Sequence, residues 1–125
     1  RIRLVAVEPV TSSALHAAFV AGGPVDVEVS GIAADSLGAR RIGSLMWPLA
    51  ESHVERVLLV DDDAIRAAQA ALWSALRVVA EPGGATAFAA LASGAYVPQK
   101  GERVGVLVCG ANTDPATVAA APGGP

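Results

Sequence analysis

The sequence predicts an α/β fold with a mainly parallel sheet flanked by helices. Three short apolar runs, at residues 2–7, 56–60 and 103–108, have the composition of strands that are buried on both faces. Segments with helical spacing or with helix start and stop signals separate these runs. Strands that alternate with helices are typical of a parallel sheet, in which ligands bind where the strands end in loops.

The first strand is expected to lead into a short helix and then a long irregular region. Glu8-Pro9 ends the strand, and one of the hydroxyl residues at positions 11–13 is expected to cap a helix over residues 13–20. Gly22-Gly23 closes this helix. An exposed extended segment, a loop and a second short helix are predicted over residues 25–29, 30–43 and 44–52.

The clearest helical pattern follows the second strand. The acidic residues 61–63 favour a helix start, because carboxylates cap the first turn and interact well with the helix dipole. The apolar residues at helical spacing are Ile65, Ala68, Leu72, Ala75, Leu76 and Val79. Residues 81–84 (EPGG) break this helix, and another is predicted over residues 85–91. Residues 119–125 are predicted to form a flexible tail.

Composition and charge exclude several classes of protein. The chain has 125 residues, 53% of them hydrophobic, which fits one small domain or part of a larger one. The net charge is −3 and the basic residues form no run beyond Arg40-Arg41, so a nucleic-acid partner is not expected. No apolar stretch reaches the length of a membrane span without a charge, Gly or Pro, so a membrane partner is not expected either.

Two features bear on the origin of the chain. Cys109 is the single cysteine, which excludes an internal disulfide and fits a reducing, cytoplasmic location. The chain begins with Arg and enters its first strand at once. We therefore expect that the natural polypeptide extends upstream and that this chain is a fragment of it.

Three local patterns are interpreted as structural. Residues 38–44 (GARRIGS) are similar to a phosphate-binding loop, but Ser44 stands where the lysine should be. The acidic run at residues 61–63 lacks the alternating spacing and the glycine of a calcium loop. His16 and His53 lie far apart without zinc-binding spacing, which favours surface or packing roles.

Cys109 follows the third apolar run and precedes Gly110, at the edge of the sheet where ligands bind. Two interpretations stay open from the residues alone. A lone cysteine is most often a small buried hydrophobe, whereas an accessible thiol can interact with a heterocyclic nitrogen.

Four segments in chain order have the pattern of one known enzyme family. They are VAVEP at 5–9, GIAADSLGA at 31–39, VAEPGGA at 79–85 and VCGAN at 108–112. These segments resemble, in the same order, the Val-x-Val-Glu-Pro, Ile-Ala-Asp-Gly-Leu, Val-Glu-Pro-x-Gly-Ala and Ser/Cys-Gly-Gly-Asn segments of serine/threonine dehydratases. The resemblance covers about residues 3 to 118.

The resemblance implies a fold, an activity and a cofactor. Residues 1–118 would form the C-terminal portion of the large, catalytic domain of a fold-type II pyridoxal-phosphate enzyme. The implied activity is that of a lyase in amino-acid metabolism, which eliminates water from L-serine or L-threonine and gives a 2-oxo acid and ammonia. Related enzymes, such as serine racemase or threonine synthase, and a non-catalytic α/β module that binds a ligand or a partner, are the alternatives.

The resemblance also implies four residues that bind pyridoxal phosphate: Cys109, Gly110, Glu81 and Ser36. The residue at the Cys109 position contacts the pyridine nitrogen in this family. A neutral residue there leaves the nitrogen largely unprotonated, which favours elimination over transamination. Glu81 matches a glutamate close to the ring, although Glu81-Pro82 also fits a plain helix break. Ser36 lies in a loop beside the cofactor and replaces the usual glycine.

A cation is implied near the cofactor in many family members. Its ligands would be the Glu8 carboxylate and the backbone carbonyls of Ser12, Leu37 and Ala39. Oxygen ligands suit a hard cation. The second acidic ligand of the members that bind divalent ions falls at Ala14, which has no carboxylate. The sequence therefore favours a monovalent ion or none.

Catalytic residues are not expected within this chain. The Schiff-base lysine of the family and its glycine-rich phosphate-binding loop lie upstream. Lys100, the only lysine here, is in a polar loop where nothing desolvates it as a Schiff-base lysine would need. We therefore expect the segment to be inactive alone and to need the missing N-terminal part of the same enzyme as its partner. The complete enzyme is expected to be a homo-oligomer that acts on a small amino acid; the preference for serine or threonine stays open.

Overall fold

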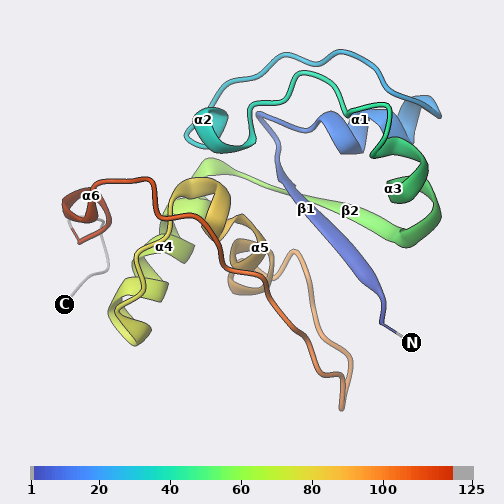
Figure 1. Cartoon of the computed structure of the whole chain (residues 1–125). Helices are drawn as coiled ribbons and strands as arrows, with labels where there is room; N and C mark the ends of the chain where they lie inside the picture. Colours follow the sequence, from blue (N-terminus) through green and yellow to red (C-terminus); the bar gives the residue numbers. More distant parts are fainter. Residues whose placement is uncertain (1, 120–125) are drawn as a thin grey trace.

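Two parallel strands, β1 (Leu4–Pro9) and β2 (Val54–Val60), lie at the centre of the computed structural model, which describes residues 2–119 (Figure 1). Their register runs from Leu4 beside Val54 to Pro9 beside Val60. Because the strands are parallel, their carboxyl ends meet at one edge of the sheet.

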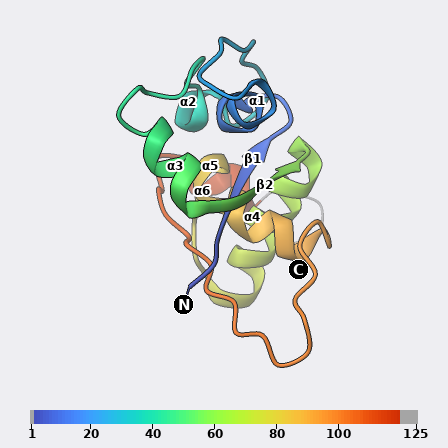
Figure 2. The same cartoon turned by 90° about the vertical axis from the view of Figure 1, so that its right-hand side faces the viewer.

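Six helices are present among the described residues. Three are short or medium helices that precede or lead into β2: α1 (Ala14–Ala21), α2 (Ala34–Leu37) and α3 (Trp47–His53). The other three follow β2: α4 (Asp62–Leu76), α5 (Pro82–Ala92) and α6 (Pro115–Ala119). The first three lie on one side of the strands and the last three on the other (Figures 1 and 2). The predicted α/β class with a parallel sheet and flanking helices is confirmed.

Local chemistry explains where the main helices start and stop. The Asp61 carboxylate accepts the N–H of Ala64 at 2.7 Å and so caps α4, as the acidic run predicts. Gly22, with φ at 75°, ends α1 and donates its N–H to the Ala18 carbonyl. A proline stands in the first turn of both α3 and α5, where its missing N–H costs no hydrogen bond.

The α4 helix ends earlier than predicted. Val79 was expected on its apolar face, but the helix stops at Leu76 because Arg77 adopts a left-handed conformation, with φ at 58°. The Arg77 guanidinium donates to the Trp73 and Ser74 carbonyls at 3.0 and 2.9 Å. The Trp73 carbonyl also accepts the Arg77 N–H, whereas the Ser74 carbonyl receives its donor from this side chain. The loop predicted over residues 30–43 also contains a helix, the four-residue α2.

The third predicted strand, at residues 103–108, is wrong for the described chain. This segment is not part of a sheet, and no backbone hydrogen bond joins it to another segment within residues 2–119. A strand needs a neighbour that takes its N–H and C=O groups, and the chain described here supplies none. Leu107 is 75% exposed in consequence.

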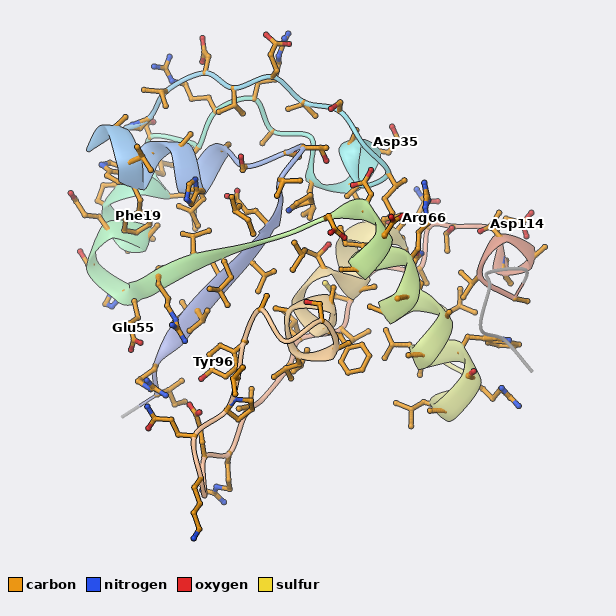
Figure 3. All side chains as sticks on the ribbon, turned by 180° about the vertical axis from the view of Figure 1, so that it is seen from behind. Phe19, Asp35, Glu55, Arg66, Tyr96 and Asp114 are labelled. Atoms are coloured by element: carbon orange, nitrogen blue, oxygen red, sulfur yellow. The ribbon has the colours of Figure 1, made fainter. Side chains whose placement is uncertain are left out.

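The core is small and rich in alanine. It lies between β2, α4 and α5, and consists of Val60, Ile65, Ala68, Leu72, Ala80, Ala85, Ala89 and Ala90. Short side chains let the backbones of α4 and α5 approach closely. Gln69 is buried and donates its amide N–H to the Ala80 carbonyl at 2.8 Å. On the other side of the sheet, Phe19 packs edge-on against Trp47, with ring centroids 5.3 Å apart (Figure 3).

No helix within residues 2–119 is long and apolar enough to cross a membrane. The predicted tail lies outside the described residues beyond Ala119.

Candidate functional site

The four residues that were expected to bind the cofactor come together around the amino-terminal end of α5. The Glu81 N–H donates to the Gly110 carbonyl at 3.0 Å, and the Cys109 N–H donates to the Gly84 carbonyl at 3.4 Å. From the opposite direction, the Ser36 hydroxyl accepts the N–H of Gly83 at 3.1 Å. Three segments that are distant in the sequence therefore share one small region at the edge of the sheet.

Glycines permit this close approach. A Cβ atom on Gly84 would overlap the Cys109 carbonyl oxygen and lie 2.9 Å from the Gly110 carbonyl oxygen. A Cβ atom on Gly83 would lie 2.5 Å from the Ser36 hydroxyl oxygen. Gly110 has φ at 73°, which favours glycine, and a Cβ atom there would overlap the Glu81 carboxylate. The sequence analysis interpreted the glycine pair at residues 83–84 as part of a helix break. A glycine pair inside a helix also indicates close packing.

Cys109 is an exposed free thiol in the described structure. Its backbone is fixed against Gly84, whereas its side chain is accessible. The interpretation of Cys109 as a small buried hydrophobe is therefore wrong. An accessible thiol can donate a hydrogen bond to a heterocyclic nitrogen or accept one from it. The exposed thiol therefore fits the expected contact with a pyridine nitrogen.

Ser36 joins α2 to α5. Besides accepting the N–H of Gly83, its hydroxyl donates to the Ala33 carbonyl at 3.3 Å. Gly83 is in the first turn of α5, where an N–H has no partner within the helix. Ser36, which departs from the dehydratase pattern, therefore caps the first turn of α5. Glu81 occupies the cap position of α5 but makes no side-chain cap hydrogen bond.

Of the residues expected to hold a cation, the structure brings Ser12 and Leu37 into contact. The Ser12 hydroxyl is buried and donates to the Leu37 carbonyl. The Glu8 carboxylate accepts the N–H groups of Leu15 and His16 at 2.9 and 2.8 Å, and Ala39 is exposed. Within residues 2–119, no group of three His, Cys, Asp or Glu side chains is arranged to hold a metal ion.

These bonds also correct the predicted cap of α1. Ser13 occupies the cap position but makes no side-chain hydrogen bond. The carboxylate of Glu8 takes over this role from the end of β1, because it reaches two free N–H groups of the first helical turn.

The sequence analysis missed the role of Asp62. Its carboxylate accepts the Ile32 N–H at 3.1 Å and the Thr11 hydroxyl at 3.4 Å. Asp62 therefore ties the loop before α2 to the loop after β1, at the edge where the strands end. The neighbouring Asp61 caps α4, so the acidic run divides between two structural tasks. No local sequence signal separates these tasks, since the partners of Asp62 lie 30 and 51 residues away.

A second polar cluster lies at the opposite end of the sheet, where Figure 3 labels Glu55 and Tyr96. The Tyr96 hydroxyl donates to the Glu102 carboxylate at 2.6 Å, and Arg3 forms an ion pair with the same carboxylate. The Tyr96 hydrogen bond, more than any other contact, holds the pKa of Glu102 below its usual range. The same bond raises the pKa of Tyr96.

The fold is that of an α/β domain with a candidate ligand site at the carboxyl edge of a parallel sheet. The family model described as "Pyridoxal-phosphate dependent enzyme" matches residues 1–110, and the chain belongs to that family.

Known relatives narrow the comparison. The chain is 42% identical over 117 residues to a phenylserine dehydratase from Ralstonia pickettii. The aligned region covers 94% of this chain and 36% of that protein. It superposes on a threonine deaminase from T.th. with a TM-score of 0.79 and 28% identity, over 90% of this chain and 40% of the other. For a serine racemase from Dictyostelium discoideum the TM-score is 0.75 at 26% identity, over 90% of this chain and 36% of the other.

These findings confirm the resemblance to dehydratases and the fold-type II assignment. They also show that the chain spans between a third and two fifths of the length of these relatives.

Proposed function

We propose that this chain is part of a pyridoxal-phosphate-dependent lyase that removes water from a β-hydroxy amino acid such as L-serine or L-threonine, giving a 2-oxo acid and ammonia. The observation that carries the proposal is the convergence of Ser36, Glu81, Cys109 and Gly110 at the start of α5. The relatives named as phenylserine dehydratase and threonine deaminase support the same reaction class.

The residues of this chain would hold and tune the cofactor. When bound, the cofactor supplies the electron-withdrawing ring that makes the elimination possible. The exposed thiol of Cys109 would contact the ring nitrogen as a neutral group, and Glu81, beside Gly110, would line the same region. Ser36 would keep the α2 loop against the start of α5. The lysine that binds the cofactor covalently is proposed to come from the rest of the polypeptide.

A monovalent cation is a further part of the proposal, with Glu8, Ser12, Leu37 and Ala39 as its ligands. The contact between Ser12 and Leu37, and the position of Glu8 at the end of β1, support a common region for three of these residues. In the described structure, the Glu8 oxygens and the Leu37 carbonyl take N–H and O–H donors. The proposed ion would therefore share these oxygens with donors of the protein.

A serine racemase is the second candidate. The similarity to the Dictyostelium discoideum enzyme favours it.

A cytoplasmic location and a homo-oligomeric complete enzyme remain predictions. The free thiol of Cys109 agrees with a cytoplasmic location.

The test uses a completed protein, in which this chain replaces the matching segment of the phenylserine dehydratase from Ralstonia pickettii. With pyridoxal phosphate and L-serine, L-threonine or phenylserine, we expect equal amounts of 2-oxo acid and ammonia, measured by coupled assays. Replacement of potassium by a large organic cation is expected to lower the rate. The chain alone is expected to bind no cofactor saturably, as measured by visible absorbance.

The parental dehydratase, treated in the same way, is the positive control. Chiral chromatography measures D-serine formed from L-serine. An excess of D-serine over 2-oxo acid would show that the completed protein is a racemase and not a lyase. Saturable cofactor binding without any product would support a non-catalytic module instead.

Ser36 offers a test of the cofactor site itself. In the completed protein, Ser36→Ala is expected to weaken cofactor binding by a few-fold to about tenfold, because one hydrogen bond contributes about 0.5–1.5 kcal/mol. Titration followed by absorbance measures the change. Ser44→Ala is the matched control, since Ser44 is exposed and makes no hydrogen bond within the described residues. Equal affinities of the two variants would show that the bond to Gly83 has no role in binding.

A further inference from the structure

One short segment of the chain carries two of the residues assigned to the candidate site. Residues 30–38, which we call the α2 segment, include Ser36, proposed to bind the cofactor, and Leu37, proposed to bind the ion. The helix α2 within this segment has four residues and no side-chain cap. Helices that short are marginal by themselves, so the position of the α2 segment depends on bonds to its neighbours.

Asp62 holds the beginning of the α2 segment. It is the first residue of α4, just after the carboxyl end of β2, and it is half-buried. One oxygen of its carboxylate accepts the Ile32 N–H at 3.1 Å, and the other accepts the Thr11 hydroxyl at 3.4 Å. Figure 3 shows α2, where Asp35 is labelled, beside the start of α4, where Arg66 is labelled. Hydrogen bonds to a carboxylate are about twice as strong as those between neutral groups.

The backbone of the α2 segment lies directly against Asp62. Gly31 has φ at 80°, a left-handed conformation that favours glycine. A Cβ atom on Gly31 would lie 2.9 Å from both carboxylate oxygens of Asp62 and would overlap the Thr11 hydroxyl oxygen. The Ser30 N–H also donates to the Thr11 carbonyl at 2.9 Å. The loop after β1, the α2 segment and the start of α4 therefore meet at this carboxylate.

The far end of the α2 segment reaches the start of α5. Four residues after Ile32, the Ser36 hydroxyl accepts the Gly83 N–H at 3.1 Å. The two partners of Asp62, Thr11 and Ile32, are not among the residues proposed to bind the cofactor. The α2 segment is thus a short connection between Asp62 and the candidate cofactor site.

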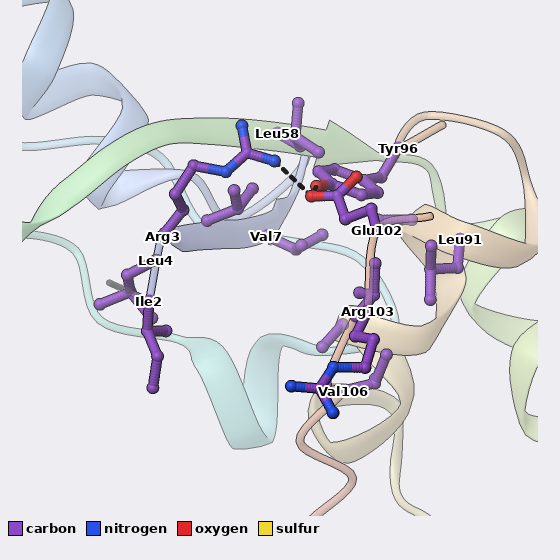
Figure 4. Close-up of a pocket in the computed structure, with 15 residues that line it drawn as sticks. Ile2, Arg3, Leu4, Val7, Leu58, Leu91, Tyr96, Glu102, Arg103 and Val106 are labelled. Carbon is purple, nitrogen blue, oxygen red and sulfur yellow. Dashed lines mark hydrogen bonds and ion pairs between the residues drawn. The ribbon is translucent and has the colours of Figure 1, made fainter. Parts of the chain in front are cut away.

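The polar cluster at the opposite end of the sheet is separate from this connection. Arg3 and Glu102, whose ion pair is the dashed line in Figure 4, line a pocket of about 590 Å³ beside β1. Asp62 and the α2 segment do not line this pocket. A change at Asp62 is therefore expected to act at the carboxyl edge of the sheet.

The neighbouring Asp61 separates two tasks of the acidic run. Its carboxylate accepts the Ala64 N–H at 2.7 Å, so α4 has a side-chain cap without Asp62. The partners of Asp62 lie 30 and 51 residues away. Loss of the Asp62 carboxylate should therefore loosen the α2 segment, whereas loss of the Asp61 carboxylate should loosen the first turn of α4.

We propose that Asp62 is a positioning residue of the cofactor site. It holds the α2 segment so that Ser36 stays against the start of α5, and it thereby sets the affinity for pyridoxal phosphate without contacting the cofactor. The inference rests on the proposed function and deepens it, since it assigns a residue that acts on that site from outside.

Absorbance titration of the completed protein measures the effect on cofactor affinity. Asp62→Ala is expected to weaken binding by about tenfold, which corresponds to about 1.4 kcal/mol and is close to the contribution of one hydrogen bond to a charged group. Asp61→Ala is the matched control, because it removes the same side chain at the next position. It is expected to lower the melting temperature through loss of the α4 cap and to leave the affinity unchanged. Equal losses of affinity in the two variants would overturn the proposal.

A double variant tests whether Asp62 acts through Ser36. If it does, Asp62→Ala combined with Ser36→Ala binds the cofactor about as weakly as Asp62→Ala alone, because the second change removes a contact that is already lost. If Asp62 only stabilises the fold elsewhere, the two losses of affinity multiply. Multiplied losses would therefore contradict a positioning role.

The conservative variant Asp62→Asn keeps the size of the side chain and an oxygen for the Ile32 N–H, but it loses the charge. We expect about threefold weaker binding, because a neutral hydrogen bond is about half as strong as a charge-assisted one. Asp61→Asn is its control, since asparagine also caps helices, and it should bind the cofactor normally. This pair decides the matter where Asp62→Ala does not fold: equal affinities of Asp62→Asn and Asp61→Asn would exclude the role of Asp62.

Amide hydrogen exchange follows the α2 segment in the completed protein without cofactor. In Asp62→Ala, exchange at residues 32–37 is expected to accelerate by at least about tenfold, while residues 68–72 of α4 keep their rates. Unchanged exchange at residues 32–37 would show that Asp62 does not hold the segment. Cofactor binding with the expected differences between variants, but without any 2-oxo acid from the unchanged completed protein, would contradict the proposed reaction and leave the assignment of Asp62 intact.

Discussion

Gly84→Ala is expected to cause the largest loss of cofactor binding of any methyl-sized change in the chain. The added Cβ atom would overlap the carbonyl oxygen of Cys109, which is backbone and has no rotamer by which to move away. Overpacking of a close contact costs about 1–3 kcal/mol or more. Because about 1.4 kcal/mol corresponds to a tenfold change, affinity for pyridoxal phosphate should fall by about 5- to 150-fold. Absorbance titration of the completed protein measures this fall.

Gly43→Ala is the matched control for this prediction. A Cβ atom on Gly43 would have no heavy atom within 4 Å, and the residue has no positive φ, so the same chemical change has room there. We expect normal affinity from Gly43→Ala. Normal affinity from Gly84→Ala as well would mean that the contact between α5 and Cys109 does not shape the cofactor site.

The second large effect concerns the stability of the chain alone. We expect the isolated chain to show a broad, non-cooperative thermal transition and to self-associate as its concentration rises. A two-stranded sheet lacks the strands that independent stability requires, and the free edge of β1 invites association. Several large apolar side chains are also exposed, including Ile2, Leu45, Val97 and Leu107. Circular dichroism at several concentrations, with light scattering, measures both effects.

The completed protein is the comparison for this experiment, and its unfolding is expected to be cooperative. A sharp transition in the pure monomeric chain, independent of concentration, would contradict the prediction. It would show that the alanine-rich core between α4 and α5 is sufficient by itself.

Local features of the sequence predicted local features of the fold. The run at residues 56–60 and the acidic start of α4 were identified correctly, because strand composition and helix capping act between near neighbours. The strand at residues 103–108 was not confirmed, because a strand also depends on a neighbour that the described chain lacks. The end of α4 was misplaced, since the left-handed conformation of Arg77 depends on carbonyl contacts that apolar spacing does not reveal.

The residues of the candidate site could be predicted from the resemblance to a family, but not from spacing and composition alone. Spacing alone offered two roles for Cys109, and the described structure decided between buried and exposed. The four residues proposed to bind the cofactor were named from family motifs, but their mutual contacts could be found only from the fold. The bond from Gly83 to Ser36 joins residues 47 positions apart, and no local pattern encodes such a pair.

Glu8 connects the candidate site to an optical signal. Its carboxylate holds the first turn of α1, and Phe19 on the same helix packs against Trp47. A change in the hydrogen bonds of the Glu8 carboxylate would therefore alter the packing of α1, and with it the contact between Phe19 and the indole ring of Trp47. If the proposed ion binds at Glu8, the emission of Trp47 is expected to change, so this indole would report ion binding without a coloured substrate or an attached dye.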